Sequence, residues 1–225
     1  MTHGSPQEDI PYHGRAVYIT SPAHLALCST WCGGPRPKLR GFRVVELGCG
    51  DGANLIPLAF YNPRAWFVGV DYSGEAVRLA QTRAEQLGLR NLRFMHADLR
   101  ALDPVDYAPA DYVIAHGVYS WVPLDVREAI LRFCRQALSP SGVACISYNT
   151  WPGWAMRGMV RELLRRSPAV VQAVGHKKAE QASAIAGQLL VDLPPRSYAY
   201  TALLAEELQR VRDGDPAYVL HEDLA

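Results

Sequence analysis

The sequence lacks several features that would assign it to a class of protein at once. Its net charge is only +1, so it lacks the basic excess of a dedicated nucleic-acid binder. It has no run of about 18 apolar residues, which predicts no transmembrane helix. Residues 1–6 lack the charged and apolar regions of a secretory signal. We therefore expect a cytoplasmic protein with one large domain, or one domain plus an appendage, and with neither nucleic acid nor membrane as a partner.

Motifs for metals and for nucleophilic catalysis are also scarce. Five cysteines stand at positions 28, 32, 49, 134 and 145, and only Cys28 and Cys32 are closely spaced. One such pair does not make a zinc site without two more ligands, so we predict no metal and reduced thiols. The nucleophile elbow G-x-S-x-G, internal repeats and low-complexity tracts are absent.

One stretch, Val44–Leu55, organises the chain: an apolar pair, an acidic residue, three alternating glycines and a helix-like run. This order is typical of a buried strand, a tight turn and a helix N-terminus. Glycines let a ligand approach the backbone, and free N–H groups at a helix start favour a polar or anionic group. A nucleotide-type ligand is the first hypothesis. A glycine-rich turn beside a surface acid is the structural alternative.

Glu46 helps to separate two kinds of nucleotide. Because Ala53 also fits the dinucleotide pattern, the glycines alone do not decide. Glu46 is expected at the carboxyl end of the first strand, where ligands of open α/β sheets bind. Its carboxylate can accept hydrogen bonds from an ammonium group. S-adenosyl-L-methionine carries such a group and a nicotinamide dinucleotide does not, so the former is favoured as cofactor.

Strands and helices alternate through the first two thirds of the chain. Short apolar runs predict buried strands, and the alternation predicts an α/β fold with a doubly wound, mostly parallel sheet. Ser21 or Thr20 is expected to cap the first helix. A turn is expected over residues 139–142. The predicted strands lie near residues 43–47, 66–70, 92–97, 111–116 and 143–148, and the predicted helices near 23–32, 52–60, 74–87 and 125–137.

Two further acids follow predicted strands. Asp71 lies 25 residues after Glu46, close to the spacing at which an acid meets ribose hydroxyls, and a carboxylate suits a cis-diol. The alternative is an N-cap for the helix that begins at Gly74. Asp98 follows the third strand and could accept the adenine amine, with the Leu99 backbone N–H beside the ring. Its alternative is a loop cap.

From residue 152 onward the pattern changes to helices alone. They are expected over residues 155–166, 169–190 and 197–212, and no further strand is predicted. Apolar residues recur there at helical spacing, which favours a face packed on the sheet. The functional alternative is a lid over the substrate.

With these residues in view, the chain resembles the class I S-adenosylmethionine-dependent methyltransferases, which have a Rossmann-like fold. Residues 46–52 resemble the family's first motif, Asp71 its ribose acid and Asp98 its adenine acid. The resemblance divides the chain into an N-terminal cap segment (1–41), a cofactor-binding domain (42–151) and a helical region (152–225). It implies that the cofactor is bound by Glu46, Gly48, Cys49, Gly50, Asn54, Asp71, Tyr72, Asp98, Leu99 and His116.

A narrower resemblance involves residues 115–123 and 147–154, and residues 156–161 continue it. These segments are similar to bacterial methyltransferases that carry a methyltransferase regulatory domain after the catalytic part. Some of those relatives are protein lysine methyltransferases that act on outer-membrane proteins. On this resemblance, residues 152–225 form a helical lid or the start of such a regulatory region, which is expected to be truncated here.

The expected catalytic groups are His116, at the end of the predicted fourth strand, and Tyr119, in the loop that follows. Methyl transfer needs orientation and water exclusion, and a neutral nucleophile must also lose a proton. His116 is placed to accept it, because an unperturbed histidine titrates near neutral pH. Tyr119 is expected to wall the substrate site with Trp121, Tyr148 and Trp151. The alternatives are a histidine that only contacts cofactor or packs under the sheet, and aromatics that only pack.

The chain departs from the family in two ways. The family finishes its sheet with two more strands, paired antiparallel, which are not found here. The fourth strand ends in His116-Gly117-Val118-Tyr119, whereas enzymes that methylate amide or base nitrogens carry an Asn/Asp-Pro-Pro-Tyr/Phe pattern, which weakens nucleobase or glutamine substrates.

The sequence therefore predicts a methyltransferase with an unidentified acceptor, either protein lysine or a small molecule, and a homodimer as one option. The first rival is a non-catalytic cofactor-binding or dimerising module, suggested by the incomplete sheet. The second is an NAD-dependent oxidoreductase.

Overall fold

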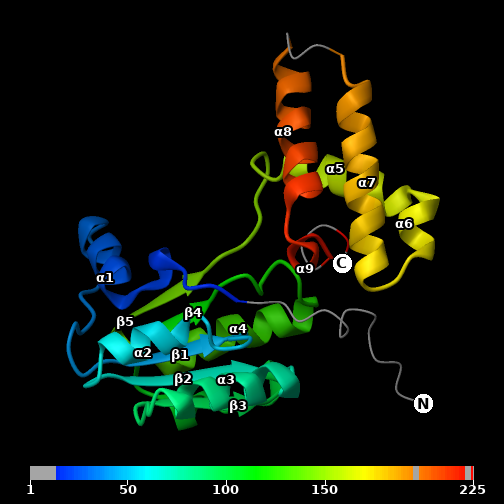
Figure 1. The fold of residues 1–225 in the computed structure, drawn as a ribbon. Coiled ribbons are helices and arrows are strands. Elements are labelled where there is room, and N and C mark those ends of the chain that lie inside the picture. The colour runs from blue at the N-terminus through cyan, green and yellow to red at the C-terminus, as the bar shows by residue number, and fades with distance from the viewer. Residues whose placement is uncertain (1–13, 195–197, 221–223, 225) are drawn as a thin grey trace. The chain divides into compact units, whose positions relative to one another are not determined.

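The computed structural model describes residues 14–194, 198–220 and 224. The described part of the chain forms two units, which divide between Tyr148 and Asn149 (Figure 1). Residues 1–13 of the predicted N-terminal cap segment lie outside the described residues. Each unit is considered by itself below.

The first unit contains a five-stranded sheet in the order β3-β2-β1-β4-β5, and every neighbouring pair is parallel. This confirms the predicted doubly wound α/β fold. Because the strands are parallel, their carboxyl ends lie at one edge of the sheet, where open α/β sheets bind ligands. The strands are β1 (Arg43–Leu47), β2 (Trp66–Asp71), β3 (Leu92–His96), β4 (Ala110–Ala115) and β5 (Leu138–Ile146).

Helices cover both faces of this sheet, as the alternating side chains of β1 show. Val44 belongs to a buried cluster that includes residues of α1, α2 and α3, whereas Val45 belongs to a second cluster that includes residues of α4. Successive strand residues point to opposite faces, so both faces of β1 are buried. The helices are α1 (Pro22–Trp31), α2 (Leu55–Tyr61), α3 (Gly74–Gln86) and α4 (Leu124–Ala137), with short 3₁₀ turns η1 (Tyr18–Thr20), η2 (Leu99–Ala101) and η3 (Pro104–Tyr107).

Local chemistry explains where several helices begin. The Ser21 hydroxyl accepts a hydrogen bond from the His24 N–H and Pro22 is the first residue of α1, as predicted. Ser73, and not Asp71, caps α3 by accepting from the Ala76 N–H. The second helix begins at Leu55 rather than near residue 52, because Gly52 still has a positive φ that a right-handed helix excludes.

The predicted turn at residues 139–142 is wrong. These residues belong to β5, which begins at Leu138 and pairs with β4. The register slips along this pair: Leu138 faces Ala110, but Val143 faces Tyr112. Five residues of β5 therefore span two residues of β4, and the Pro-Ser-Gly sequence forms an irregularity inside the strand.

The second unit is helical in the part that the structure describes, with no strand there. Its helices are α5 (Ala155–Arg166), α6 (Pro168–Gln172), α7 (His176–Asp192), α8 (Ala199–Asp213) and the short α9 (Pro216–Tyr218). The helix predicted over 169–190 is split into α6 and α7, because Gly175 takes a φ of 56° between them. A buried apolar cluster holds α5 to α8 together. The Arg157 guanidinium lies over the Trp154 and Tyr218 rings and donates to the Tyr218 hydroxyl.

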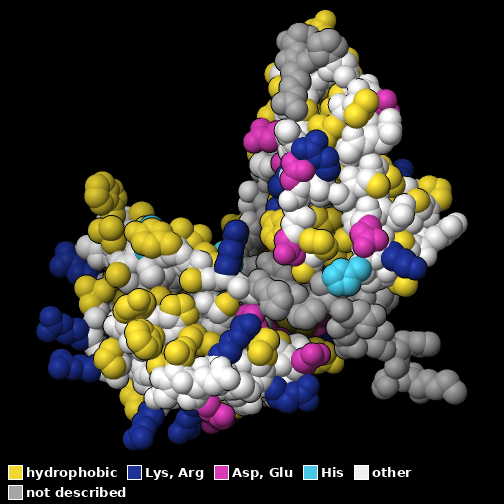
Figure 2. Space-filling model, viewed as in Figure 1, with side chains coloured by type: hydrophobic (Ala, Val, Ile, Leu, Met, Phe, Trp, Pro, Cys, Tyr) yellow, Lys and Arg dark blue, Asp and Glu magenta, His cyan; other side chains and the backbone are white. Residues whose placement is uncertain are grey.

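The surface of the first unit carries apolar side chains around α1 and α2 (Figure 2). Leu27 and Trp31 of α1, and Phe60 and Tyr61 of α2, are exposed. On the face shown, lysine and arginine side chains are spread over the surface and do not gather in one large patch. In the described residues, no helix combines the length and apolar character that crossing a membrane requires.

Candidate functional site

The turn between β1 and α2 is built on glycines at 48, 50 and 52, all with positive φ. A Cβ at Gly52 would lie 2.6 Å from the Phe94 ring and 3.0 Å from Ala80, so this glycine is required by packing. A Cβ at Gly50 would meet nothing within 4 Å. The backbone at Gly50 is therefore open to an approaching ligand, whereas Gly52 faces the core.

Several contacts hold the turn in place. The Val70 carbonyl of β2 accepts hydrogen bonds from the Gly48 and Cys49 N–H groups, at 2.8 and 3.1 Å. Arg83 of α3 donates to the buried Asp51 carboxylate at 2.6 Å and to the Asp51 carbonyl at 3.2 Å. A Cβ at Gly48 would collide with Val118, so the loop after β4 packs directly on the turn. The turn is thus fixed from three sides by the protein itself.

Glu46, at the end of β1, is buried with only 3% of its surface exposed. Its Oε1 accepts a hydrogen bond from Asn54 Nδ2 at 2.7 Å. Its Oε2 is buried and has no hydrogen-bond partner among the described residues. Burial raises the pKa of Glu46 to about 8, and the nearby Asp71 carboxylate contributes to the same rise. A cationic group beside Oε2 would relieve both effects.

Asn54 joins Glu46 to the segment that precedes α1. Asn54 Nδ2 also donates to the Thr20 hydroxyl at 3.0 Å, and its Oδ1 accepts from the Val17 N–H at 3.0 Å. Thr20 is fully buried. The sequence offered Thr20 only as an alternative cap. Its contact with Asn54 was missed because the two residues lie 34 positions apart and share no motif.

Asp71, the last residue of β2, bridges the turn and α3. Its Oδ2 accepts from the Gly50 N–H at 2.7 Å, and its Oδ1 accepts from the Ser73 N–H at 2.8 Å. Each carboxylate oxygen has a second lone pair, so a half-exposed Asp71 can still accept hydroxyl groups. The next residue, Tyr72, is exposed.

Cys49 lies inside the turn and is buried. Burial, with smaller contributions from the carboxylates of Asp71 and Glu46, raises the pKa of its thiol far above the usual range. The thiol therefore stays protonated and is not a nucleophile. Among the described residues, no group of three or more His, Cys, Asp or Glu is arranged to hold a metal ion.

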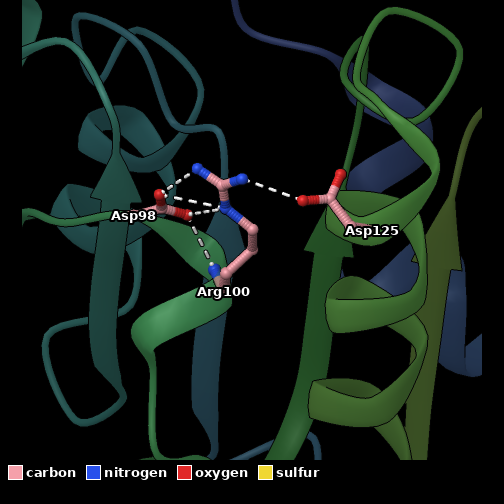
Figure 3. A network of polar contacts seen from close by, with 3 residues as sticks. All are labelled: Asp98, Arg100 and Asp125. Carbon is pink, nitrogen blue, oxygen red and sulfur yellow. Dashed lines mark hydrogen bonds and ion pairs between the residues drawn. The ribbon is translucent and has the colours of Figure 1, made fainter.

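Asp98, two residues after β3, is part of an ionic network (Figure 3). Its carboxylate caps η2 by accepting from the Arg100 N–H and contacts the Arg100 guanidinium through Nε and Nη2, the latter at 2.6 Å. Arg100 Nη1 reaches Asp125 of α4 at 2.8 Å. The hydrogen bonds from Arg100 lower the pKa of Asp98. Leu99 beside it is buried. No motif in the sequence indicates the contacts of Arg100 with Asp98 and Asp125.

His116 and Tyr119 lie in the loop after β4. Burial, and secondarily the charge of Arg15, lower the pKa of the half-buried His116, so its neutral form is favoured. The Ser147 hydroxyl at the end of β5 accepts from the Gly117 N–H at 2.9 Å. Arg127 of α4 donates to the carbonyls of Val122 and Ser120 and lies over the Tyr119 ring.

The structure thus joins Glu46 to Asn54, and the turn to Asp71 through the Gly50 N–H. Asp98 follows β3 and His116 follows β4, at the same edge of the parallel sheet. Of the predicted aromatic wall, Tyr119 and Tyr148 have ring centroids 6.1 Å apart. Trp121 is half-buried in the same loop as Tyr119. Trp151 is exposed and belongs to the second unit.

An open parallel sheet with a glycine turn and acids at its strand ends defines a nucleotide-binding α/β protein. Comparison with known proteins narrows this class. Residues 44–142 match the family model described as "Methyltransferase domain". The structure matches PKMT2 from Rickettsia typhi in complex with AdoHcy, with a TM-score of 0.84 and 31% identity, over 96% of this chain and 41% of that chain.

Two uncharacterised proteins of Rickettsia prowazekii (strain Madrid E) are also similar. One is 30% identical over 217 residues, which is 96% of this chain and 86% of that protein. The other is 41% identical over 160 residues, which is 71% of this chain and 29% of that protein. The chain thus spans less than half the length of this second relative and of PKMT2.

The chain belongs to the class I S-adenosylmethionine-dependent methyltransferases. The described residues fit the cofactor of that family: Glu46 Oε2 is a buried acceptor with no protein partner among them, and the backbone at Gly50 is open. Both are suited to a ligand with an ammonium group and a nucleoside.

We expect Gly50→Ala and Gly52→Ala to separate binding from packing. Both substitutions introduce a left-handed strain of about 1–2 kcal/mol, but only the methyl group added at Gly52 also meets the Phe94 ring, which adds about 1–3 kcal/mol of overpacking. Urea denaturation should therefore show the larger loss of unfolding free energy for Gly52→Ala. Calorimetric titration should show that Gly50→Ala folds yet binds S-adenosylhomocysteine at least about 10-fold more weakly. Equal losses of unfolding free energy in the two variants would contradict the conclusion that Gly52 is required by packing and Gly50 is not.

We expect Glu46→Gln to gain stability relative to the natural protein as pH rises. Between the ordinary pKa of 4.5 and about 8, Glu46 is ionised in the unfolded chain but protonated in the folded one. The natural protein therefore loses stability with rising pH in this window and levels off above about 8, whereas Gln does not titrate. Melting temperatures should diverge across pH 4.5–8. A difference in melting temperature between Glu46→Gln and the natural protein that stays constant with pH would contradict the raised pKa of Glu46.

Proposed function

We propose that this chain transfers the methyl group of S-adenosylmethionine to an acceptor nitrogen, with the lysine side chain of a protein as the favoured acceptor class. The observation that carries the cofactor half of the proposal is Glu46: a buried carboxylate under an open glycine turn, with one oxygen lacking a protein partner among the described residues. Similarity to PKMT2 and the resemblance of residues 115–123 and 147–154 support the acceptor class. When bound, the cofactor supplies a methyl group already activated on a sulfonium.

Four side chains have separate roles in this proposal. Glu46 receives the ammonium group of the cofactor. Asp71 accepts the ribose hydroxyls while holding the turn through the Gly50 N–H. Asp98 accepts the adenine amine, sharing its carboxylate with Arg100. His116, kept neutral by burial, accepts a proton from the acceptor nitrogen.

A lysine acceptor must lose its proton before attack, because an ammonium has no free electron pair. A neutral His116 is suited to that task at pH 7, since burial disfavours its protonated form until a proton donor is placed beside it. Tyr119 and Tyr148 offer aromatic faces to a cationic side chain, and Arg127 keeps the loop that carries Tyr119 in place. A cytoplasmic location and a homodimer belong to the same proposal.

A non-catalytic cofactor-binding or dimerising module is the second candidate. It is favoured by one observation: in the residues that the structure describes, β5 is an edge strand with no further strand beside it. Such a module would bind S-adenosylhomocysteine without methylating any acceptor. An NAD-dependent oxidoreductase is the third hypothesis, and its cofactor offers no ammonium group to the unpartnered oxygen of Glu46.

The first experiment measures which cofactor binds. We expect calorimetric titration to show binding of S-adenosylhomocysteine and none of NAD. We expect Asp71→Ala to weaken that binding about 10- to 100-fold, because it removes a charged hydrogen-bonding partner worth about 1–3 kcal/mol. The exposed Asp106→Ala is the matched control and should bind as the natural protein does. Unchanged affinity in Asp71→Ala would remove Asp71 from the ribose role, and binding of NAD alone would overturn the cofactor.

The second experiment tests catalysis. We expect the chain to transfer labelled methyl groups to proteins of a bacterial lysate, and His116→Ala to slow this transfer about 100-fold or more while changing S-adenosylhomocysteine affinity less than about 3-fold. His96→Ala, an exposed histidine at the end of β3, is the control. Lost cofactor affinity with normal turnover would make His116 a cofactor contact instead. Absence of any transfer by the natural chain would favour the module.

A further inference from the structure

The carboxamide of Asn54 is fully committed to the protein. Its two N–H donors are directed at Glu46 Oε1 (2.7 Å) and the Thr20 hydroxyl (3.0 Å), and its oxygen accepts from the Val17 N–H (3.0 Å). The Thr20 hydroxyl in turn donates to the Val17 carbonyl at 2.8 Å. Asn54 is itself buried, so each of these bonds replaces water that would otherwise solvate it.

The orientation of this amide follows from its neighbours. The Val17 N–H can only donate, so the Asn54 oxygen must face it. The nitrogen must then face Glu46, where it supplies two hydrogens that a carboxylate and a hydroxyl can accept. A flipped amide would place two oxygens against each other at Glu46 and two N–H groups against each other at Val17. The Val17 N–H, in the segment before α1, therefore determines that the nitrogen of Asn54, and not its oxygen, faces Glu46.

Asn54 has no donor left for a ligand, which separates it from the residues that contact cofactor. Glu46, by contrast, has one oxygen fixed by Asn54 and one oxygen without a partner among the described residues. Because the carboxyl group is planar and rigid, the hydrogen bond that holds Oε1 also sets the direction in which Oε2 points. Oε2 is therefore pre-oriented to receive one ammonium group.

We propose that Asn54 is a positioning residue that orients Glu46 toward the ammonium group of the cofactor, and that Thr20 and the Val17 backbone extend the cofactor site into the segment before α1. This inference rests on the proposed binding of S-adenosylmethionine. It reassigns Asn54, which the sequence placed among the cofactor contacts. It also gives residues 17–20 a role in affinity although they belong to no glycine or acid motif.

The inference predicts that Asn54 affects only the amino-acid end of the ligand. S-adenosylhomocysteine and 5′-methylthioadenosine share the nucleoside and the thioether, but only the former carries the ammonium group. We expect Asn54→Ala to weaken S-adenosylhomocysteine binding about 10- to 100-fold and 5′-methylthioadenosine binding less than about 3-fold. Asn62→Ala, at the other end of α2, is the matched control, because its side chain donates to the Leu58 carbonyl of its own helix. It should change neither affinity.

A pH profile separates positioning from general loss of structure. The titratable groups that act electrostatically with Glu46 are Asp71 of β2, Cys49 of the turn and Cys145 of β5. Neither thiol is ionised near neutral pH, because both pKa values are raised. Affinity of the natural protein for S-adenosylhomocysteine should rise from about pH 6 to about 8 as Glu46 ionises. Because the Asn54 hydrogen bond lowers the pKa of Glu46, Asn54→Ala should move this rise to higher pH.

The outcomes are distinguishable. Equal weakening of both ligands by Asn54→Ala, or an unshifted pH profile, would overturn the positioning role while leaving the proposed function intact. Failure of the natural protein to bind S-adenosylhomocysteine would overturn both. Thermal denaturation reports folding of each variant. If Asn54→Ala does not fold, Thr20→Val tests the same network with a shape-matched loss of one hydroxyl, and it should weaken S-adenosylhomocysteine alone, by about 3- to 10-fold.

Discussion

Burial of the Glu46 carboxyl group is the constraint on which the rest of the first unit depends. A carboxylate placed inside a protein is costly unless its oxygens are hydrogen-bonded or faced by a cation. Here Asn54 bonds one oxygen, and no described residue bonds the other. The sheet carries this cost at the end of β1, where a hydrophobic residue would pack better. The oxygen without a hydrogen-bond partner lies under the open glycine turn, where a bound ligand could supply the missing donor. Such a site gives up some folding stability in favour of binding.

The residues around the Glu46 carboxyl group bury it and fix its orientation. Asn54 links it to Thr20 and to the Val17 backbone. The buried Cys49 of the turn lies close enough to interact with it electrostatically. Asp71 lies close enough to Glu46 to raise the pKa of Glu46 further. The oxygens of Asp71 accept hydrogen bonds from the Gly50 and Ser73 N–H groups. Burial of Glu46, with the Asp71 carboxylate nearby, thus favours the protonated form of Glu46 until a cation lies beside it.

Much of this arrangement follows from the sequence, because parallel strands end at a common edge. The acids at or just beyond the carboxyl ends of three predicted strands had to lie at one edge of the sheet once the alternation indicated parallel strands. The glycine spacing located the turn at the same edge. What could not be predicted depends on contacts without a local pattern. Thr20 meets Asn54 across 34 residues, and Arg100 joins the loop after β3 to α4 (Figure 3). The turn predicted inside β5 failed because pairing with β4 overrides the preference of its Pro-Ser-Gly sequence. The prediction of one helix over 169–190 was wrong because Gly175 takes a positive φ, which the periodicity of apolar residues does not reveal.

The hydrogen bonds that hold the β1–α2 turn in place have a thermodynamic consequence for ligand binding. Arg83 holds Asp51, Val70 accepts from two successive N–H groups, and Asp71 holds the Gly50 N–H, all before any ligand arrives. A loop that is already ordered loses little conformational entropy when a small molecule settles on it. Complex formation at this end of the sheet therefore requires no folding step. Differences in affinity among related nucleosides should reside in how fast they leave rather than in how fast they arrive.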